Sequence, residues 1–588
     1  MKAPIIISIS AVIIALGYST PAQTPCDELS KYPIRFAILG DRTGGHEEEV
    51  YEAVVAEIER MRPDFVMTVG DMIEGYISDT VEINARWDEY FGIVRLLSIP
   101  VHYTPGNNDI TSDVMEPAYR SRVGEPYYSF DHRGLHFVVL DNSRPESFAE
   151  MPDAQIAWLK DDLAKHRNAC HTLVFMHKPF WYRTLGDGKP DGLHDIFKAN
   201  GVDAVFTGHF HAYFSAQFDG IKYTSLGSSG GSAEESPEGL LYHFGWVTVD
   251  TSGIHIAPIK KDAVLPWDIQ TLAQRRAFST VRASSLTFSE LLPLEETPDG
   301  GLKLASGPVT VAIHNPTVNA EWSDTLRWET PDGWTITPSV YPYTMAAGAT
   351  IAAKFTVSPA AKLYPLPKIS TRMPYAEGRL TEVSRDLEVA RIALCTKAQG
   401  QVLIDGQLTE TCWSKPVTAL FNNDGTPSAQ DSSRFYFAYD EVNLYVGAYC
   451  RESRMDQLRA TMTERDAAVF TEDAIGGMLQ PEPPFGAACQ IYVNPLGTIS
   501  DQLLERASDG YWTGRQDWNG EFEVKATRGA DFYAVEMRIP LAQFGATADA
   551  GDRWRVNFRR KQAHLNSAAA FQAPWQYSPS SYGELVFE

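Results

Sequence analysis

The sequence is poor in positive charge for its length. Its 588 residues carry 51 lysines and arginines against 75 aspartates and glutamates, a formal net charge of −24. This balance argues against a nucleic acid as the main partner and offers no basic patch to an anionic membrane. The apolar fraction of 44% is ordinary for globular proteins, and the chain is too long for one core, so three domains are expected.

Long apolar runs are also scarce. The most pronounced one, Ile5–Leu16, follows Lys2 and precedes small residues around Thr20–Ala22. It is shorter than the roughly 20 apolar residues that a membrane span requires. The pattern predicts a secretory signal peptide over residues 1–22 and a mature protein that is secreted or periplasmic, with no membrane span.

Cysteine is sparse, and none of the six cysteines has a CxxC spacing, which argues against a zinc or thioredoxin-type site. Six cysteines fit an oxidising compartment. Cys26 and Cys170 form the first expected disulfide. The other four allow three connectivities, and they are Cys395, Cys412, Cys450 and Cys489.

Five short apolar runs end in side chains of the kinds that bind metals. These side chains are Asp41, Asp71, Asn107, His177, His209 and His211. We interpret the runs as buried strands, and the helical apolar spacing between several of them predicts a layered α/β domain. Ligand sites in open α/β sheets lie at the carboxyl ends of the strands. Oxygen and imidazole donors gathered there suit a hydrolytic two-metal centre.

From residue 33 to about 260, this ordered set resembles the calcineurin-like metallophosphoesterases. The resemblance implies two packed mixed sheets flanked by helices, with the site on loops at the strand ends. It also implies that Asp71 bridges two metal ions. The remaining implied ligands are Asp41 and His211 on one ion, and Asn107, His177 and His209 on the other.

One departure from the family pattern affects the first ion. The family's Asp-x-His is replaced by Asp41-Arg42-Thr43, so this ion loses an imidazole. Candidate substitute ligands are Glu74, Tyr76 and His46. The alternative for each is a solvated loop residue.

The second departure affects catalysis. Asn108 stands where the family has a histidine, and an amide can donate a hydrogen bond but cannot deliver a proton. General acid catalysis typically contributes about a hundredfold to ten-thousandfold. Esters with acidic leaving groups should therefore suffer least, unless His46 or His102 takes the role. The expected catalytic residues are Asn108, Asp71 and His46.

The implied reaction is hydrolysis of a phosphate mono- or diester by a metal-bound hydroxide, held between two ions roughly 3.5–4 Å apart. Mn, Fe, Zn and Co all suit such mixed ligands. Lys178 is a candidate for neutralising the substrate, with a solvated lysine as the alternative. Residues 227–231, Gly-Ser-Ser-Gly-Gly, could offer N–H groups to phosphate or form a plain loop.

After about residue 263, short alternating runs and turn signals replace the helical patterning, as in β-sandwiches. The predicted boundaries are 30–262 for the metallophosphoesterase domain, 275–385 for an immunoglobulin-like spacer and 390–588 for a last domain. In the spacer, Trp322, Trp328 and Trp334 are expected in core and hinge packing rather than on sugars.

The last domain contains Ile404-Asp405-Gly406, Cys412-Trp413, a hairpin around residues 440–443, and strand patterns near 491–497 and 554–560. Through these motifs, residues 390–588 resemble family 9 carbohydrate-binding modules and their DOMON-like relatives. The resemblance implies a jelly-roll-like sandwich that in some members stacks a sugar between aromatic rings and holds calcium in loops. Trp413 and Trp554 are expected in the core. The glycan-binding candidates are Tyr511, Trp512, Trp518 and Trp575.

The expected architecture is thus an α/β/β/α metallophosphoesterase sandwich followed by two all-β sandwich domains. Three functions remain open. The first is a secreted phosphoesterase targeted to a polysaccharide or cell-surface glycan. The second is a glycan-binding protein with an attenuated phosphoesterase domain, and the third is a metal-stabilised scaffold.

Overall fold

The computed structural model describes residue 29 and residues 32–588, apart from 78, 234–235, 237–239, 298–301, 318–319, 419–420, 423–424, 427, 429, 482–485, 507–511 and 516–517. The predicted signal peptide, Cys26 and Tyr511 lie outside the described residues. The chain divides into two compact units, residues 1–272 and 273–588. Among the helices of the described residues, none is both long and apolar enough to cross a membrane.

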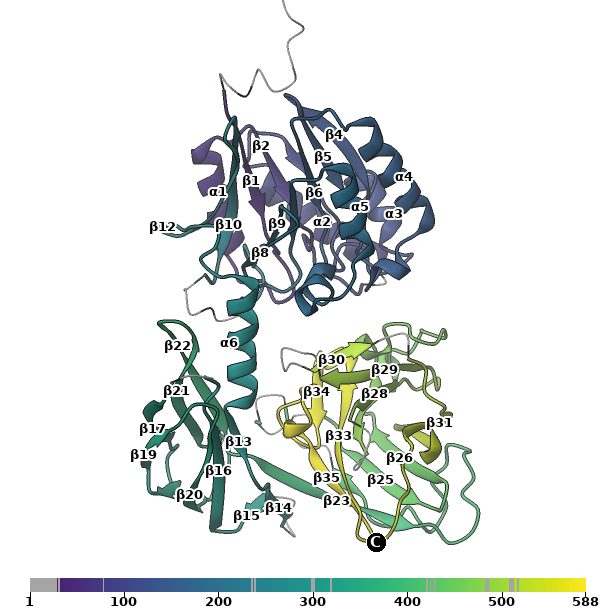
Figure 1. Ribbon diagram of the computed structural model, residues 1–588. Coiled ribbons are helices and arrows are strands. Elements are labelled where there is room, and N and C mark those ends of the chain that lie inside the picture. Colours follow the sequence, from purple (N-terminus) through teal and green to yellow (C-terminus); the bar gives the residue numbers. More distant parts are fainter. Residues whose placement is uncertain are drawn as a thin grey trace, which may run out of the picture. The chain divides into compact units, whose positions relative to one another are not determined.

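The first unit contains two mixed β-sheets (Figure 1). One has the strand order β12-β11-β10-β1-β2-β3, and the other has the order β4-β5-β6-β7-β9-β8. The strands of the first sheet are β1 (Ile34–Leu39), β2 (Phe65–Thr68), β3 (Val101–His102), β10 (His243–Asp250), β11 (Gly253–Lys260) and β12 (Ala263–Val264). Those of the second are β4 (Tyr128–His132), β5 (Leu135–Val139), β6 (His171–Phe175), β7 (Ala204–Thr207), β8 (Phe214–Phe218) and β9 (Ile221–Ser225).

Helices follow most of the parallel strands and cover the outer faces of the two sheets. They are α1 (Val50–Met61), α2 (Thr80–Val94), α3 (Glu116–Arg122), α4 (Asp153–Lys165) and α5 (Gly192–Asn200). Helix α2 begins after Asp79 and α5 after Asp191, and each aspartate accepts a hydrogen bond from a backbone N–H of the first turn. Such caps satisfy donors that a helix leaves free at its start.

Alternation along the strands explains why the sheets pack in layers. In β1, Phe36 and Ile38 belong to the core between the sheets, whereas Ala37 and Leu39 belong to the core under α1 and α2. The opposite sheet repeats this pattern on its own two faces. Successive strand residues point to opposite faces, so strands that are apolar throughout fit a sheet covered on both sides. This arrangement confirms the predicted α/β sandwich.

The second unit begins with α6 (Leu272–Ser284) and two four-stranded sheets around a shared apolar core. One sheet contains β13 (Leu286–Phe288), β16 (Gly307–His314), β18 (Thr335–Thr337) and β20 (Thr350–Ser358), and the other contains β17 (Trp322–Glu329), β19 (Val340–Met345), β21 (Lys368–Ala376) and β22 (Arg379–Asp386). Trp328 and Trp334 are buried in this core, while Trp322 is half-buried against it.

The rest of the unit is one large, mostly antiparallel sheet folded around a separate core. Its main path runs through β23 (Val389–Lys397), β25 (Ser433–Tyr439), β26 (Asn443–Arg451), β27 (Ala474–Gln480), β28 (Ala488–Val493), β29 (Ile499–Arg506), β30 (Trp512–Arg515), β31 (Glu523–Arg528), β32 (Phe532–Pro540), β33 (Arg553–Gln562) and β35 (Gly583–Phe587). Side pairings add β14 (Leu292–Glu296), β15 (Leu302–Leu304), β24 (Val417–Thr418) and β34 (Ser567–Ala570). Strands β25 and β26 pair antiparallel around residues 440–442, as the predicted hairpin requires, and Trp413 and Trp554 are buried.

The prediction of disulfides among the four C-terminal cysteines is wrong. Cys395, Cys412, Cys450 and Cys489 are free thiols, all buried. Three of them lie on different strands and pack in the main core, where cysteine acts as a small apolar side chain. The Cys26–Cys170 pair stays a prediction, because Cys26 lies outside the described residues.

Candidate metal centre

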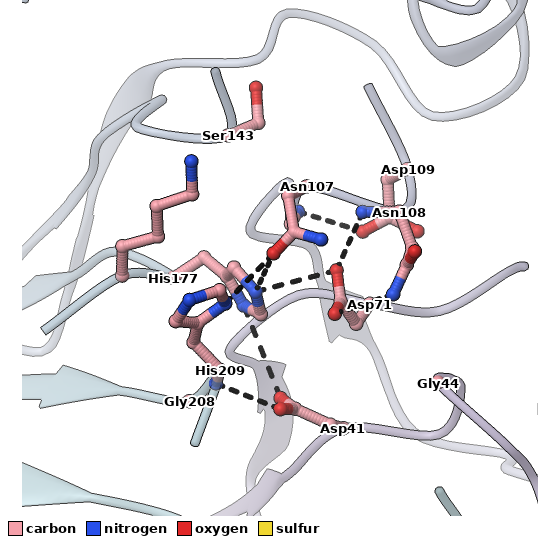
Figure 2. A network of polar contacts seen from close by, with 12 residues as sticks. Asp41, Gly44, Asp71, Asn107, Asn108, Asp109, Ser143, His177, Gly208 and His209 are labelled. Atoms are coloured by element: carbon pink, nitrogen blue, oxygen red, sulfur yellow. Dashed lines mark hydrogen bonds and ion pairs between the residues drawn. The ribbon is translucent and has the colours of Figure 1, made fainter. Parts of the chain in front are cut away.

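The predicted metal-binding side chains come from loops that follow strands of both sheets in the first unit. Asp41, Asp71 and Asn107 follow β1, β2 and β3, whereas His177 and His209 follow β6 and β7. Figure 2 shows these five side chains facing one another. Because the two sheets pack face to face, their strand ends bring residues far apart in the sequence to one place.

Hydrogen bonds link the Asn107 and Asp71 loops to the histidines. The Asn107 Oδ1 atom lies 2.9 Å from both His177 Nε2 and His209 Nδ1. Both oxygens of Asp71 accept from Asn108, one from its backbone N–H and one from its side-chain amide, each at 2.8 Å. The Asp71 Oδ1 atom also lies 3.4 Å from His177 Nε2.

Asp41 has an unsatisfied oxygen at the centre of this group. Its Oδ2 atom accepts from the His209 backbone N–H at 2.8 Å and lies 3.4 Å from His211 Nε2. Its Oδ1 atom is buried and has no hydrogen-bond partner among the described residues. One donor atom each of Asp41, Asp71 and His177 lie within 4.8 Å of one another, close enough to hold a metal ion.

Two of the histidines are oriented by backbone carbonyls. The Nδ1 atom of His177 lies 2.7 Å from the Val69 carbonyl oxygen, and that of His211 lies at hydrogen-bond distance from the Ser232 carbonyl oxygen. A carbonyl on one ring nitrogen sets the tautomer, so the other nitrogen is left as a ligand. Both remaining Nε2 atoms face the carboxylates.

Burial and neighbouring charges shift the pKa values of the buried acids and imidazoles of this cluster in different directions. Burial raises the pKa of Asp41. Burial opposes the charge of His177, but Asp71 and Asp41 outweigh it and raise the pKa of His177 to about 9. Burial and the nearby His177 lower the pKa of His209 to about 3. A cation bound here would compete with the His177 proton.

The backbone at the ligands is unusual. Asp71, His209 and His211 have positive φ values of 56°, 74° and 51°. Side chains other than glycine rarely adopt this region, and such strain concentrates at functional sites. The preceding Gly208 is also required, since a Cβ atom there would lie 2.4 Å from Asp41 Oδ1.

Comparison with known proteins agrees with this geometry. Residues 34–213 match the family model "Calcineurin-like phosphoesterase". These residues form a calcineurin-like phosphoesterase domain. The chain is 27% identical to purple acid phosphatase 15 of Arabidopsis thaliana over 230 residues, which cover 32% of this chain and 42% of that protein. It is 26% identical to the human serine/threonine-protein phosphatase CPPED1 over 224 residues, covering 34% of this chain and 71% of that protein.

The chain therefore spans about half the length of the plant relatives it matches. Among solved structures, a dimetal phosphatase from Danio rerio is 14% identical with a TM-score of 0.31, covering 40% of this chain and 99% of that one. A family 9 carbohydrate-binding module from Caldicellulosiruptor kristjanssonii in complex with glucose is 17% identical with a TM-score of 0.25, covering 33% of this chain and 96% of that one. Neither TM-score reaches 0.5, so neither match bears on substrate.

Two residues that support the phosphoesterase site were missed by the sequence reasoning. The buried Asp109 carboxylate accepts from the backbone N–H groups of Gly106, Met72 and Ile73, so it ties the Asn107 loop to the Asp71 loop. The Asn142 side chain accepts from the His177 N–H at 2.9 Å and donates to the Lys178 carbonyl oxygen at 2.8 Å. Asn142 follows β5, so the same strand-end rule could have found it.

The residue in place of the missing imidazole has a structural role. The Thr43 side chain is buried, and its hydroxyl donates to the Asp71 and Ile73 carbonyl oxygens at 3.0 and 2.8 Å. Among the candidate substitutes, Glu74 lies 3.3 Å from His46 Nδ1 and 3.4 Å from the Gly44 N–H. Glu74 and His46 therefore pair with each other beside the ligand group, and Tyr76 is exposed.

Three further candidates are engaged elsewhere. Lys178 is buried and pairs with Glu146 at 2.6 Å, so it is not a solvated lysine. The N–H groups of residues 229–231 all donate to the Asp41 carbonyl oxygen at 2.9–3.2 Å, so they hold the Asp41 loop and are not free for phosphate. His102 stacks on Phe130, with ring centroids 3.9 Å apart, as a packing residue.

In the second unit, the aromatic candidates have different surroundings. Trp575 is half-buried beside Tyr492, and the Arg559 guanidinium lies 4.5 Å from the centroid of its ring. Trp512 packs against a small apolar cluster that also contacts Trp575. Trp518 packs on Phe522 and the main core. Tyr511 lies outside the described residues.

Several buried carboxylates of the second unit already have protein partners. Glu472 accepts from the Thr461 N–H and hydroxyl, and Glu536 accepts from three backbone N–H groups. Among the described residues of this unit, no group of histidine, cysteine or acidic residues has metal-binding spacing. Calcium in this unit stays a prediction.

Proposed function

We propose that this chain is an exported, metal-dependent phosphoesterase that hydrolyses a phosphate mono- or diester at the Asp41–Asp71–His177 site. The observation that supports hydrolysis most strongly is the orphaned Asp41 Oδ1 atom among buried donors. A buried polar atom without a partner costs about 1–3 kcal/mol, more when charged, and a bound cation removes that cost. Export is part of this proposal and rests on the pattern of residues 1–22 alone.

The donor set fits two ions that share Asp71. One would take Asp41, Asp71 and His211, and the other Asp71, Asn107, His177 and His209. Both Asp71 oxygens keep lone pairs beyond their bonds to Asn108, because a carboxylate has about four acceptor sites. When bound, such ions supply Lewis-acid stabilisation of the phosphoryl oxygens and lower the pKa of a water molecule. Mn, Fe, Zn and Co all suit this mixture of donors.

The two ion positions should differ in affinity. The Thr43 hydroxyl donates to backbone carbonyls, so the ion position of Asp41 and His211 gains no ligand from residue 43. The closest replacement is the His46–Glu74 pair. It lies across Gly44, where an added Cβ would be 2.9 Å from the His211 ring.

Proton delivery in this site differs from that in the family pattern. The Asn108 amide is held by Asp71 Oδ2 and can stabilise a phosphoryl oxygen, but it cannot protonate a leaving group. His46 is one-third exposed and oriented by Glu74, so it is the candidate acid. Without an efficient acid, esters with acidic leaving groups should be the better substrates.

The deciding experiment measures hydrolysis of p-nitrophenyl phosphate and bis(p-nitrophenyl) phosphate by the full chain reconstituted with Mn, Fe, Zn or Co. Metal content is quantified in the same samples. Asp71→Asn and His209→Ala should lose bound metal and turnover together. Asp195→Asn, an exposed aspartate on α5, should keep both. Bound metal without turnover of either ester would contradict the hydrolase and favour a glycan-binding protein with an inactive phosphoesterase domain.

Glycan binding by the second unit is the second candidate function. A sugar packs its apolar face on an aromatic ring while polar groups hold its hydroxyls. Trp575 offers a half-buried ring next to Arg559, and the nearby Tyr577 is 39% exposed and accepts from Gln502 at 3.1 Å. Pull-down on insoluble polysaccharides should weaken in Trp575→Ala. Trp322→Ala in the other sandwich should bind as the parent does, and equal binding by all three proteins would reject this site.

A further inference from the structure

A second cluster of histidines and aspartates lies in the first unit, away from the candidate metal centre. Asp131 lies on β4, His136 on β5, Asp162 in the last turn of α4, and His166 directly after that helix. His136 is paired in register with Thr172, at the start of β6, whereas His177 follows the end of β6. At roughly 3.3 Å per strand residue, the cluster is roughly 15 Å from the His177 site.

The contacts within this cluster are close. His136 Nδ1 lies 2.8 Å from Asp131 Oδ1, and His136 Nε2 lies 2.9 Å from Asp162 Oδ2. His166 Nδ1 lies 2.8 Å from the Asp162 carbonyl oxygen, and His166 Nε2 lies 3.8 Å from Asp131 Oδ2. The two imidazole rings stack, with centroids 3.9 Å apart and planes 14° from parallel.

Asp162 therefore holds one nitrogen of each ring, through its carboxylate for His136 and its backbone carbonyl for His166. Metal-binding histidines almost always have their second nitrogen held by a carboxylate, a backbone carbonyl or a water molecule. The other nitrogen of each ring faces Asp131. Donor atoms of Asp131, His136 and His166 lie within 4.8 Å of one another.

We propose that Asp131, His136 and His166 bind one divalent transition-metal ion, with Zn²⁺ as the reference ion, independently of the phosphoesterase centre. Two imidazoles and a carboxylate are three of the four ligands of a tetrahedral zinc site, and a water molecule takes the fourth. Ligands roughly 2.0–2.1 Å from zinc are about 3.3 Å apart in a tetrahedron. The Asp131 contacts of 2.8 and 3.8 Å lie on either side of that value.

Binding requires a rearrangement, because an ion lies in the plane of each imidazole that binds it and the two rings are nearly parallel. The side chains of His166 and Asp131 are 31% and 61% exposed, so they can turn. His136 is buried, and Asp162 is fixed further by the Ser129 hydroxyl at 2.9 Å. The ion would thus fasten the end of α4 to the β4–β5 hairpin.

The same contacts also suit a cluster held by hydrogen bonds alone, with His136 between the Asp131 and Asp162 carboxylates. The two possibilities differ in what added metal does. A zinc site takes up one ion and stabilises the fold, because a ligand that binds only the folded state raises its stability. A cluster held by hydrogen bonds alone does neither.

The test is equilibrium dialysis of the full chain against Zn²⁺, with elemental analysis, and a Co²⁺ titration followed by visible absorption. Relative to the parent, Asp131→Asn and His166→Ala should each lose one metal equivalent and the matching part of the cobalt absorption, with phosphatase turnover unchanged. Asp162→Asn should weaken that site by about ten- to a hundredfold, as outer-shell substitutions do. His255→Ala, an exposed histidine beside Asp250, is the matched control and should bind as the parent does.

Thermal unfolding is a second test of the proposed zinc site. Zinc should raise the melting temperature of the parent more than that of Asp131→Asn, an exposed residue whose replacement leaves the core intact. Equal stoichiometry and equal zinc-induced shifts in the parent and Asp131→Asn would overturn the proposal. The outcome is separable from that at the phosphoesterase centre, because His209→Ala removes metal there and should leave this equivalent bound.

Discussion

At the residue scale, two small side chains set this phosphoesterase domain apart from the pattern it resembles. Thr43 stands in place of an imidazole, and its hydroxyl satisfies the Asp71 and Ile73 carbonyls, so it supports the loop rather than an ion. Asn108 stands in place of a histidine, and its amide is bonded to Asp71. The loop geometry is kept while one ligand and one acid are removed, so we expect a working centre with weakened chemistry.

Restoring the acid should raise the rate on poor substrates. We expect Asn108→His to increase hydrolysis of an alkyl phosphate by up to about a hundredfold, the lower end of what general acids contribute. Hydrolysis of p-nitrophenyl phosphate should change little, because its leaving group needs no proton. Steady-state kcat/KM for both esters, at equal metal content, checks this. A parallel rise for both esters would contradict a role in protonating the leaving group, and would show that the histidine acts on a step that both esters share.

His243 should make the first unit sensitive to acid. Burial lowers the pKa of His243 from 6.5 to about 4, and its Nε2 atom accepts from the Gly227 N–H at 3.1 Å. Above pH 6.5, the His243 side chain is neutral in both the folded and the unfolded chain, so it does not change the stability. Below pH 6.5 the unfolded chain binds the proton first, so stability falls until the pH passes 4.

When the pH falls from 7.5 to 5, we expect His243 to lower the free energy of unfolding by about 2 kcal/mol, at about 1.4 kcal/mol per pKa unit. His243→Gln keeps an acceptor for Gly227 and should remove that part of the pH dependence. Urea unfolding midpoints of parent and variant at both pH values measure the difference. The two proteins losing the same stability on acidification would show that His243 does not titrate in this range.

At the scale of elements, the glycines that end the strands hold the site together. Gly70 has a φ of 104°, and a Cβ atom there would lie 2.6 Å from His177 Nδ1 and 2.7 Å from Gly106 Cα. The turn after β2 can thus approach the ligand loops of β3 and β6 only without a side chain. Gly253, the first residue of β11 after the β10–β11 turn, has a φ of 126° but no atom within 4 Å of such a Cβ.

These two glycines separate backbone strain from crowding. Gly253→Ala should cost about 1 kcal/mol of stability through its positive φ alone. Gly70→Ala should cost more and also weaken metal binding, since the added methyl displaces His177 or the Asn107 loop. Thermal unfolding and metal dissociation constants for both variants check this. Equal losses, with metal affinity unchanged, would contradict the role of Gly70 in spacing the ligand loops.

Elements and their order followed well from the sequence, because strands buried on both faces appear as continuous apolar runs, most of which end in Gly-Asp, Gly-Asn or Gly-His. The contacts between neighbouring strands and loops did not follow from the sequence. Nothing in the pattern shows that the Asp41 carbonyl uses the N–H groups of residues 229–231, or that Asp109 spans two loops. Those contacts depend on which strands become neighbours, which periodicity leaves open. The free cysteines were missed for the same reason, because an even number of cysteines and an oxidising compartment do not show which sulfur atoms lie close together.

At the scale of the whole molecule, the chain joins two units with separate cores, and the two candidate metal sites lie in the first. The four free thiols lie in the second unit, where burial raises the pKa of Cys412 to about 11 and those of Cys395, Cys450 and Cys489 as well. The thiolate is the reactive form, so these cysteines should be inert in the folded chain. Their stabilising role is packing, and reductant should leave the second unit unchanged.

Thiol counting tests the cysteines of both units at once. The folded chain should show almost no reaction with a thiol reagent, whereas the chain unfolded without reductant should show four thiols. The four are the six cysteines of the sequence less the predicted Cys26–Cys170 pair. Reduction before unfolding should raise the count to six. Six thiols without reductant would refute the predicted pair, and two or none would refute the free thiols of the second unit.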